Sequence, residues 1–190
     1  MTEKICVFCG ASSGHNKIYI ENTKLFAKEI VKNNLTLVYG GGKVGIMGTI
    51  ANEVIAGGGK VIGVIPEILN NLNLGNEKIT EMKVVSDMHT RKKTMYEMAD
   101  YFVALPGGIG TFEEITEILT WKQISIHTKP IALLNINNFY DGYINFLQKA
   151  VDEGFMKQIV VDNIIVEKDC NKIIDRLRTA KNDKQESKFM

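Results

Sequence analysis

The chain has 190 residues, of which 45% are hydrophobic, and its 23 basic and 22 acidic residues give a net charge of +1. This size and composition suit one compact domain, which we expect over residues 1–180, before a polar and disordered tail over 181–190. The balanced charge offers no electrostatic footprint for a nucleic acid or an anionic membrane. We therefore expect neither a nucleic acid nor a membrane as a partner. Because we find neither a signal segment nor an apolar run of membrane-spanning length, we expect a cytoplasmic protein.

Apolar runs alternate with amphipathic stretches of helical period along the chain. We expect strands at residues 4–9, 35–39, 60–65, 82–86, 101–105, 130–135 and 164–166, of which 101–105 has the continuous apolar run of a buried parallel strand. We expect helices at residues 17–33, 44–56, 88–99, 112–124, 140–154 and 170–180. On the first helix, Leu25, Phe26 and Ile30 fall on the expected buried side. The Asn-rich stretch 68–78 is predicted to be a loop that borders the site. The whole order specifies a doubly wound, Rossmann-like α/β sheet with helices on both faces.

The three cysteines are an odd number and argue against a disulfide framework. Cys6 and Cys9 form a C-x-x-C pair, which could indicate redox chemistry or half of a zinc site. However, the pair lies within an apolar strand run, and no second pair follows. A structural role is therefore favoured.

A glycine-rich loop, Gly40-Gly41-Gly42, follows the second strand and opens the second helix. Gly40-x-Gly42-x-x-Gly45 satisfies the dinucleotide fingerprint. No acidic residue follows about twenty positions on to hold an adenosine ribose. We therefore interpret the loop as an edge of a mononucleotide pocket, with an NAD-dependent oxidoreductase as a less favoured alternative.

The helix expected at 88–99 carries a cation at an unusual position. Asp87 is a candidate N-cap, and Met88, Arg91 or Lys92, and Met95 share one face of the helix. A guanidinium on an apolar stripe is costly to bury unless it meets an anion. The alternative is that Arg91 reaches the helix edge and pairs with a surface carboxylate. The residues alone leave both interpretations open.

The fifth strand runs into Pro106-Gly107-Gly108-Ile109-Gly110-Thr111, after which the chain continues as an amphipathic helix. The N–H groups of the first turn and the helix dipole would form an anion site, most naturally for a phosphate. Thr111-x-x-Glu114 fits a capping box, which the spacing alone favours. The alternative is that Glu114 acts on another part of the ligand, and the helix N-terminus should then keep Glu114 ionised.

Three motifs in this order resemble the LOG ("Lonely guy") family of cytokinin riboside 5'-monophosphate phosphoribohydrolases. They are Tyr39-Gly40-Gly41-Gly42-Lys43-x-Gly45-x-Met47-Gly48, Met88-His89-x-Arg91-Lys92-x-x-Met95 and Pro106-Gly107-Gly108-x-Gly110-Thr111-x-x-Glu114. The resemblance runs from about Lys4 to Asp169. Members are often labelled lysine decarboxylases, but we find no motif here for the pyridoxal phosphate lysine that such an enzyme uses.

The resemblance implies cytokinin biosynthesis by cleavage of the N-glycosidic bond of N6-substituted adenosine 5'-monophosphates. The products would be a free base and ribose 5-phosphate, with water as co-substrate and with neither a metal nor a cofactor. The resemblance implies Arg91 and Glu114 as catalytic residues. The substrate-binding residues that it implies are Gly41, Gly42, Met88, Lys92, Gly107, Gly108, Ile109, Gly110, Thr111, Glu113 and Thr120. It also implies a homodimer that shares the helices around 88–95 and 114–121.

Two alternatives to this function stay open. Asn73 stands where the plant members carry an acidic ligand-contacting residue, so plain AMP could be the main substrate. A nucleotide-binding sensor could use the same fold and the same loops without turnover.

Overall fold

A parallel sheet of seven strands runs through the middle of the molecule, in the order β4-β3-β2-β1-β5-β6-β7. This computed structural model describes residues 2–186. The strands are β1 (Lys4–Phe8), β2 (Thr36–Tyr39), β3 (Lys60–Pro66), β4 (Glu81–Val85), β5 (Tyr101–Ala104), β6 (Ile131–Leu134) and β7 (Ile164–Glu167). Each short apolar run predicted from the sequence thus forms one strand.

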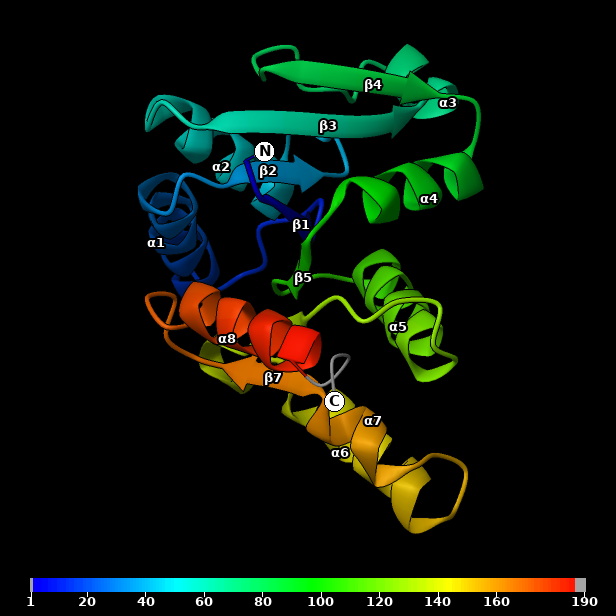
Figure 1. The fold of residues 1–190 in the computed structure, drawn as a ribbon. Helices are drawn as coiled ribbons and strands as arrows, with labels where there is room; N and C mark the ends of the chain where they lie inside the picture. The colour runs from blue at the N-terminus through cyan, green and yellow to red at the C-terminus, as the bar shows by residue number, and fades with distance from the viewer. Residues whose placement is uncertain (1, 187–190) are drawn as a thin grey trace.

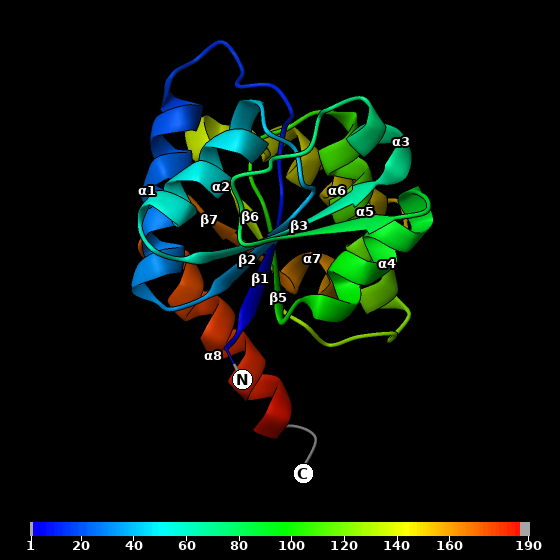
Figure 2. The same cartoon turned by 90° about the horizontal axis from the view of Figure 1, so that it is seen from above.

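Helices cover both faces of the sheet, as Figures 1 and 2 show from two directions. They are α1 (Ile18–Lys32), α2 (Gly45–Ala56), α3 (Glu67–Asn71), α4 (Met88–Met98), α5 (Ile109–Gln123), α6 (Asp141–Asp152), α7 (Gln158–Asp162) and α8 (Ile173–Glu186), with a 3-10 turn η1 (Ile136–Asn138). In the view along the sheet, α1, α2 and α8 lie on one side and α4 to α7 on the other. The doubly wound fold is therefore confirmed.

Two hydrophobic cores, one on each face, hold these layers together. Along β1, Ile5 and Val7 pack into the core with α1, α2 and α8, whereas Cys6 and Phe8 pack into the core with α4 and α5. A strand that is buried on both faces needs apolar residues at every position. This requirement explains the uninterrupted apolar runs in the sequence.

Some local expectations were wrong. The stretch 68–78 is not all loop, because α3 occupies its start, and α7 was not expected. Leu25 is 50% exposed on α1, although Phe26 and Ile30 are buried as expected. The last helix continues to Glu186, six residues beyond its expected end at Ala180. The remainder of the expected tail, 187–190, lies outside the described residues.

The winding of the sheet reverses between β1 and β5, which are neighbours at its centre. The segments that follow these strands stay together, since the Gly10 N–H donates to the Pro106 carbonyl at 3.1 Å. The buried Tyr140 hydroxyl donates to the Leu105 carbonyl at 2.6 Å and fixes the end of β5. Open α/β sheets place ligands at such a switch point. Within residues 2–186, no helix combines the length and apolar character needed to cross a membrane.

Removing the Tyr140 hydroxyl should destabilise the fold without emptying the core. Tyr140→Phe leaves the Leu105 carbonyl without this buried donor, so we expect the free energy of unfolding to fall by about 1–3 kcal/mol. Urea titration followed by circular dichroism measures the loss. The matched control is Tyr143→Phe, whose hydroxyl contacts Thr116 at an exposed position and should change stability by less than about 0.5 kcal/mol. Equal losses in the two variants would contradict this assignment.

Candidate active site

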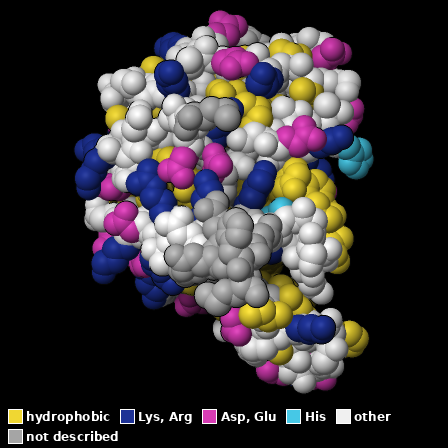
Figure 3. Space-filling model, in the orientation of Figure 1, with side chains coloured by type: hydrophobic (Ala, Val, Ile, Leu, Met, Phe, Trp, Pro, Cys, Tyr) yellow, Lys and Arg dark blue, Asp and Glu magenta, His cyan; other side chains and the backbone are white. Residues whose placement is uncertain are grey.

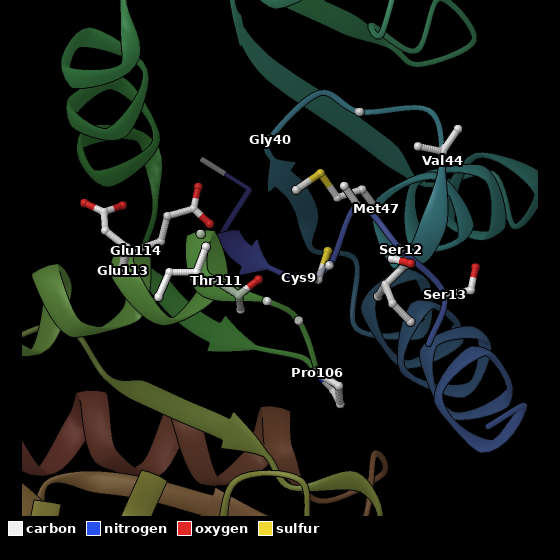
Figure 4. A pocket seen from close by; sticks show the side chains of 18 of the residues that line it. Cys9, Ser12, Ser13, Gly40, Val44, Met47, Pro106, Thr111, Glu113 and Glu114 are labelled. Carbon is white, nitrogen blue, oxygen red and sulfur yellow. The ribbon is translucent and has the colours of Figure 1, made fainter. Parts of the chain in front are cut away.

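A pocket of about 710 Å³ opens at the carboxyl edge of the central strands. It is lined by the segments that follow β1, β2 and β5, together with residues from α1, α2, α4 and α5. Figure 4 shows Thr111, Glu113 and Glu114 on one side, with Val44, Met47, Ser12 and Ser13 across from them. This volume is in the range that holds a small organic ligand.

The start of α5 presents backbone donors to the pocket. The N–H groups of Thr111 and Phe112 both donate to the Gly108 carbonyl. Those of Ile109 and Gly110 have no acceptor among the described residues. A side chain built at Gly108 or Gly110 would meet no atom within 4 Å, so space for a ligand lies beside these donors. Free N–H groups at the positive end of a helix dipole form an anion site.

The capping-box interpretation of Thr111 and Glu114 does not hold. The N-cap of α5 is Gly108, so Thr111 is the third residue of the helix and cannot cap it. Thr111 is buried against Gly107, where an added Cβ would lie 2.1 Å from its hydroxyl oxygen. Gly107 thus allows the threonine to pack closely at the turn.

Arg91 and Glu114 form a buried ion pair at the pocket wall. The Arg91 Nη1 donates to the Glu114 Oε1 at 2.8 Å, and the two side chains are only 6% and 7% exposed. The Arg91 Nε donates to the Val64 carbonyl of β3 at 3.1 Å. Asp87 caps α4 by accepting from the Thr90 N–H at 2.8 Å, as expected. Arg91 therefore meets a buried carboxylate, not a surface one.

The protonation of Glu114 is set by burial and by Arg91. Burial raises the pKa of Glu114 above its ordinary value, and the Arg91 guanidinium opposes this shift. The pKa thus shifts in the direction opposite to the one expected from the helix N-terminus. Glu114 is the sixth residue of α5, beyond the first turn where the helix dipole acts most strongly.

Lys92 contacts α5 instead of the pocket. Its Nζ donates to Glu117 at 3.0 Å and to Glu113, and its side chain is only 12% exposed. These contacts fasten α4 to α5 beside the Arg91 and Glu114 pair. Glu113, which does line the pocket, is thereby held by a neighbouring cation.

The structure brings most of the expected site residues to one pocket. Those that line it are Arg91, Glu114, Gly42, Met88, Gly107, Gly108, Ile109, Gly110, Thr111 and Glu113. Gly41, Lys92 and Thr120 do not. Gly41 has a φ of +78° and packs against Ile65 and Met82. Thr120 lies near the far end of α5, where its hydroxyl donates to the Thr116 carbonyl.

Several lining residues were not identified from the sequence as site residues. Phe139 follows β6 and Met47 lies on α2, while Leu69 and Leu74 come from α3 and the segment after it. Phe139 could have been found, because it follows a strand that ends at the same edge of the sheet. The two leucines lie in the stretch 68–78, which we expected to border the site, but its irregular pattern did not single them out.

The cysteines are buried thiols in the interior of the fold. All three are free and buried. Cys9 lines the pocket floor, and burial, with a further contribution from the Glu114 carboxylate, raises the pKa of its thiol well above the ordinary value. A thiol held in its protonated form is a poor nucleophile. In the part of the chain that the structure describes, no three His, Cys or acidic side chains come together as a possible metal site.

Residues 47–177 match a family model described as "Possible lysine decarboxylase". The chain is 51% identical over 153 residues to the cytokinin riboside 5'-monophosphate phosphoribohydrolase LOG2 of Arabidopsis thaliana, covering 80% of this chain and 72% of the relative. It is 44% identical over 175 residues to LOG7 of the same plant, an enzyme of the same name, covering 92% and 81%.

Solved structures share the fold at low sequence identity. The molybdenum cofactor carrier protein of Chlamydomonas reinhardtii superposes with a TM-score of 0.72 at 19% identity, over 95% of this chain and 98% of that one. The molybdenum cofactor binding protein of Rippkaea orientalis gives 0.72 at 17% identity, over 94% and 97%. At such identities the likeness concerns the fold alone.

Removing Arg91 should expose the cost of burying Glu114. We expect Arg91→Met to lower the free energy of unfolding at pH 7 by about 3–5 kcal/mol, because a buried carboxylate loses its partner. Since Arg91 lowers the pKa of Glu114, its loss raises this pKa further. A carboxyl whose pKa is higher in the folded than in the unfolded state loses stabilisation as the pH rises between the two values. The deficit should therefore shrink from pH 7 towards about pH 4.5, measured by urea titration.

The double variant Arg91→Met/Glu114→Gln is the control for this experiment. It has no carboxylate to bury, so it should recover much of the lost stability at pH 7 and should lack the pH-dependent deficit. A deficit of the same size at both pH values, or a double variant as unstable as Arg91→Met at pH 7, would count against the buried pair.

Proposed function

The chain belongs to the LOG family of cytokinin riboside 5'-monophosphate phosphoribohydrolases, and we propose that its pocket holds the nucleotide with the 5'-phosphate at the start of α5. The protein is a hydrolase that acts on the N-glycosidic bond of cytokinin nucleotides and releases the free base and ribose 5-phosphate. The buried contact between Arg91 and Glu114, beside an open helix N-terminus, is the observation that carries the assignment of roles.

The N–H groups of Ile109 and Gly110 bind the phosphate, with the positive end of the α5 dipole. The ribose then lies along the first turns of α5, next to Glu114. Cleavage passes through an oxocarbenium-like state with positive charge at C1'. The Glu114 carboxylate stabilises this charge or attacks it, and Arg91 holds the carboxylate in place.

The atoms balance with water as the only co-substrate. The bond between C1' and the base nitrogen breaks, the base nitrogen gains a proton, and the oxygen of water forms the new bond at C1'.

Ile65, Leu69 and Leu74 line the pocket from β3 and the segment that follows it. They offer apolar surface to an N6-alkyl group, which supports a substituted adenine over plain AMP. A cytoplasmic location remains a prediction from the sequence.

The wild-type protein should release ribose 5-phosphate from N6-isopentenyl-AMP faster than from AMP. Glu114→Gln and Arg91→Ala should each lower kcat by about 10²–10³-fold, because each removes a charge aimed at the reacting centre. Coupled detection of ribose 5-phosphate measures the rates.

The matched controls are Glu153→Gln at the C-cap of α6 and Arg176→Ala on α8, two half-exposed members of ion pairs that do not line the pocket. These variants should keep wild-type rates. If the wild type binds both nucleotides but releases nothing, the protein is a sensor. A faster reaction with AMP would make AMP the main substrate.

We also propose a homodimer formed through α4 and α5. Hydrophobic side chains gather on the side of the molecule where α5 and the segment after it lie (Figure 3), and Ile124 and Ile126 are 61% and 55% exposed there. Exposed apolar groups that cluster on one face are typical of a protein interface.

If a neighbouring subunit completes the pocket, specific activity should fall as the protein is diluted through the dissociation range of the dimer. Light scattering at the same concentrations gives the oligomeric state. Full specific activity in a sample that scatters as a monomer would contradict the proposal.

A further inference from the structure

The first glycine of the loop after β2 lies against the guanidinium of Arg91. A Cβ built on Gly40 would be 2.1 Å from the Arg91 Nη2 and 3.2 Å from its Cζ. Real Cβ atoms essentially never come within 3.0 Å of another heavy atom in this way. The guanidinium therefore occupies the space that any side chain at position 40 would need.

The nitrogen next to Gly40 is the one that remains for a ligand. The Arg91 Nε donates to the Val64 carbonyl and Nη1 donates to Glu114. Nη2 has no acceptor among residues 2–186, although Arg91 is 95% buried and lines the pocket. An oxygen of a bound substrate would accept from this nitrogen in a charge-assisted hydrogen bond.

We infer that Gly40 is a positioning residue for Arg91, and this inference rests on the proposed function. Its lack of a side chain lets Nη2 sit at the pocket wall while the other two nitrogens keep their acceptors. Arg91 cannot yield without breaking one of these bonds, because it is held from β3 and from α5. Gly40 thus shapes the catalytic pair without itself contacting the reacting atoms.

The backbone makes Gly40 a clean position to test. Gly41 in the same loop and Gly45 at the start of α2 have φ values of +78° and +63°, so a side chain at either position would strain the backbone. Gly40 does not have a positive φ, and its backbone therefore suits alanine. Gly40→Ala changes mainly the contact with the guanidinium.

Steady-state kinetics with N6-isopentenyl-AMP should separate positioning from binding. We expect Gly40→Ala to lower kcat by about 10²-fold, the size of effect that a displacement of about 1 Å causes in an active site. KM should stay near the wild-type value, because the phosphate donors at the start of α5 are untouched. Gly142→Ala on α6, whose added Cβ meets no atom within 4 Å, is the matched control and should keep both constants. Wild-type kcat in Gly40→Ala would overturn the inference.

A double-mutant cycle with Arg91→Lys tests the same contact without turnover. Lysine lacks the Cζ, Nη1 and Nη2 atoms, so the added Cβ has no guanidinium to meet. The thermal midpoint should fall clearly when Gly40→Ala is made in the wild type and only slightly when it is made in Arg91→Lys. Equal losses in the two backgrounds would overturn the inference even if Gly40→Ala folds poorly. If the cycle shows this coupling but the wild-type protein cleaves no nucleotide, the proposed function is refuted and the contact between Gly40 and Arg91 stands.

Discussion

The contact between Arg91 and Glu114 joins the two halves of the sheet at the point where the winding reverses. Arg91 comes from α4, which carries the chain from the edge strand β4 to the central strand β5, and Glu114 comes from the helix after β5. Taking two charges out of water costs several kcal/mol per ion unless geometry and further hydrogen bonds compensate. The Val64 carbonyl supplies one such bond. Apolar residues of similar volume would often be at least as stable, so the pair is better explained by chemistry than by stability.

The glycines of the two loops meet different steric demands. At Gly107 the absent side chain leaves space for Thr111, and at Gly40 it leaves space for Arg91. Gly108 and Gly110 face open space beside unpaired N–H groups, which is where a ligand is expected. Some glycines of the motif therefore allow close packing within the protein, and others leave room for a ligand. Which role a glycine has can be told only from the residues around it in the structure. This distinction explains why the dinucleotide fingerprint around Gly40 is satisfied here in an enzyme of the LOG family.

The central strands could be predicted because each is short, apolar and buried on both faces. All seven strands agree with their expected ranges to within two residues at each end, including the partly exposed edge strand β4. The elements α3 and α7 could not be predicted, since five residues are too few to show a helical period. The spacing on its own could not decide whether Arg91 meets a buried anion or a surface carboxylate, because the answer depends on α5, which is remote in the sequence. The shift in the pKa of Glu114 was misjudged because burial depends on neighbours that are remote in the sequence. Thr120 lies close to the motif in the sequence and was expected at the site, but in the structure it lies near the far end of α5, away from the pocket.

The two ends of the pocket differ in how they can change during evolution. At the start of α5 the groups presented to a ligand belong to the main chain, so a substitution there alters their direction only by distorting the turn. At the other walls, Met47, Leu69, Leu74 and Met88 present side chains. Methionine and leucine exchange in apolar surroundings at small cost in stability. With the phosphate placed at the start of α5 as proposed, substitutions at the other walls would change the base that is accepted without changing the groups that hold the phosphate.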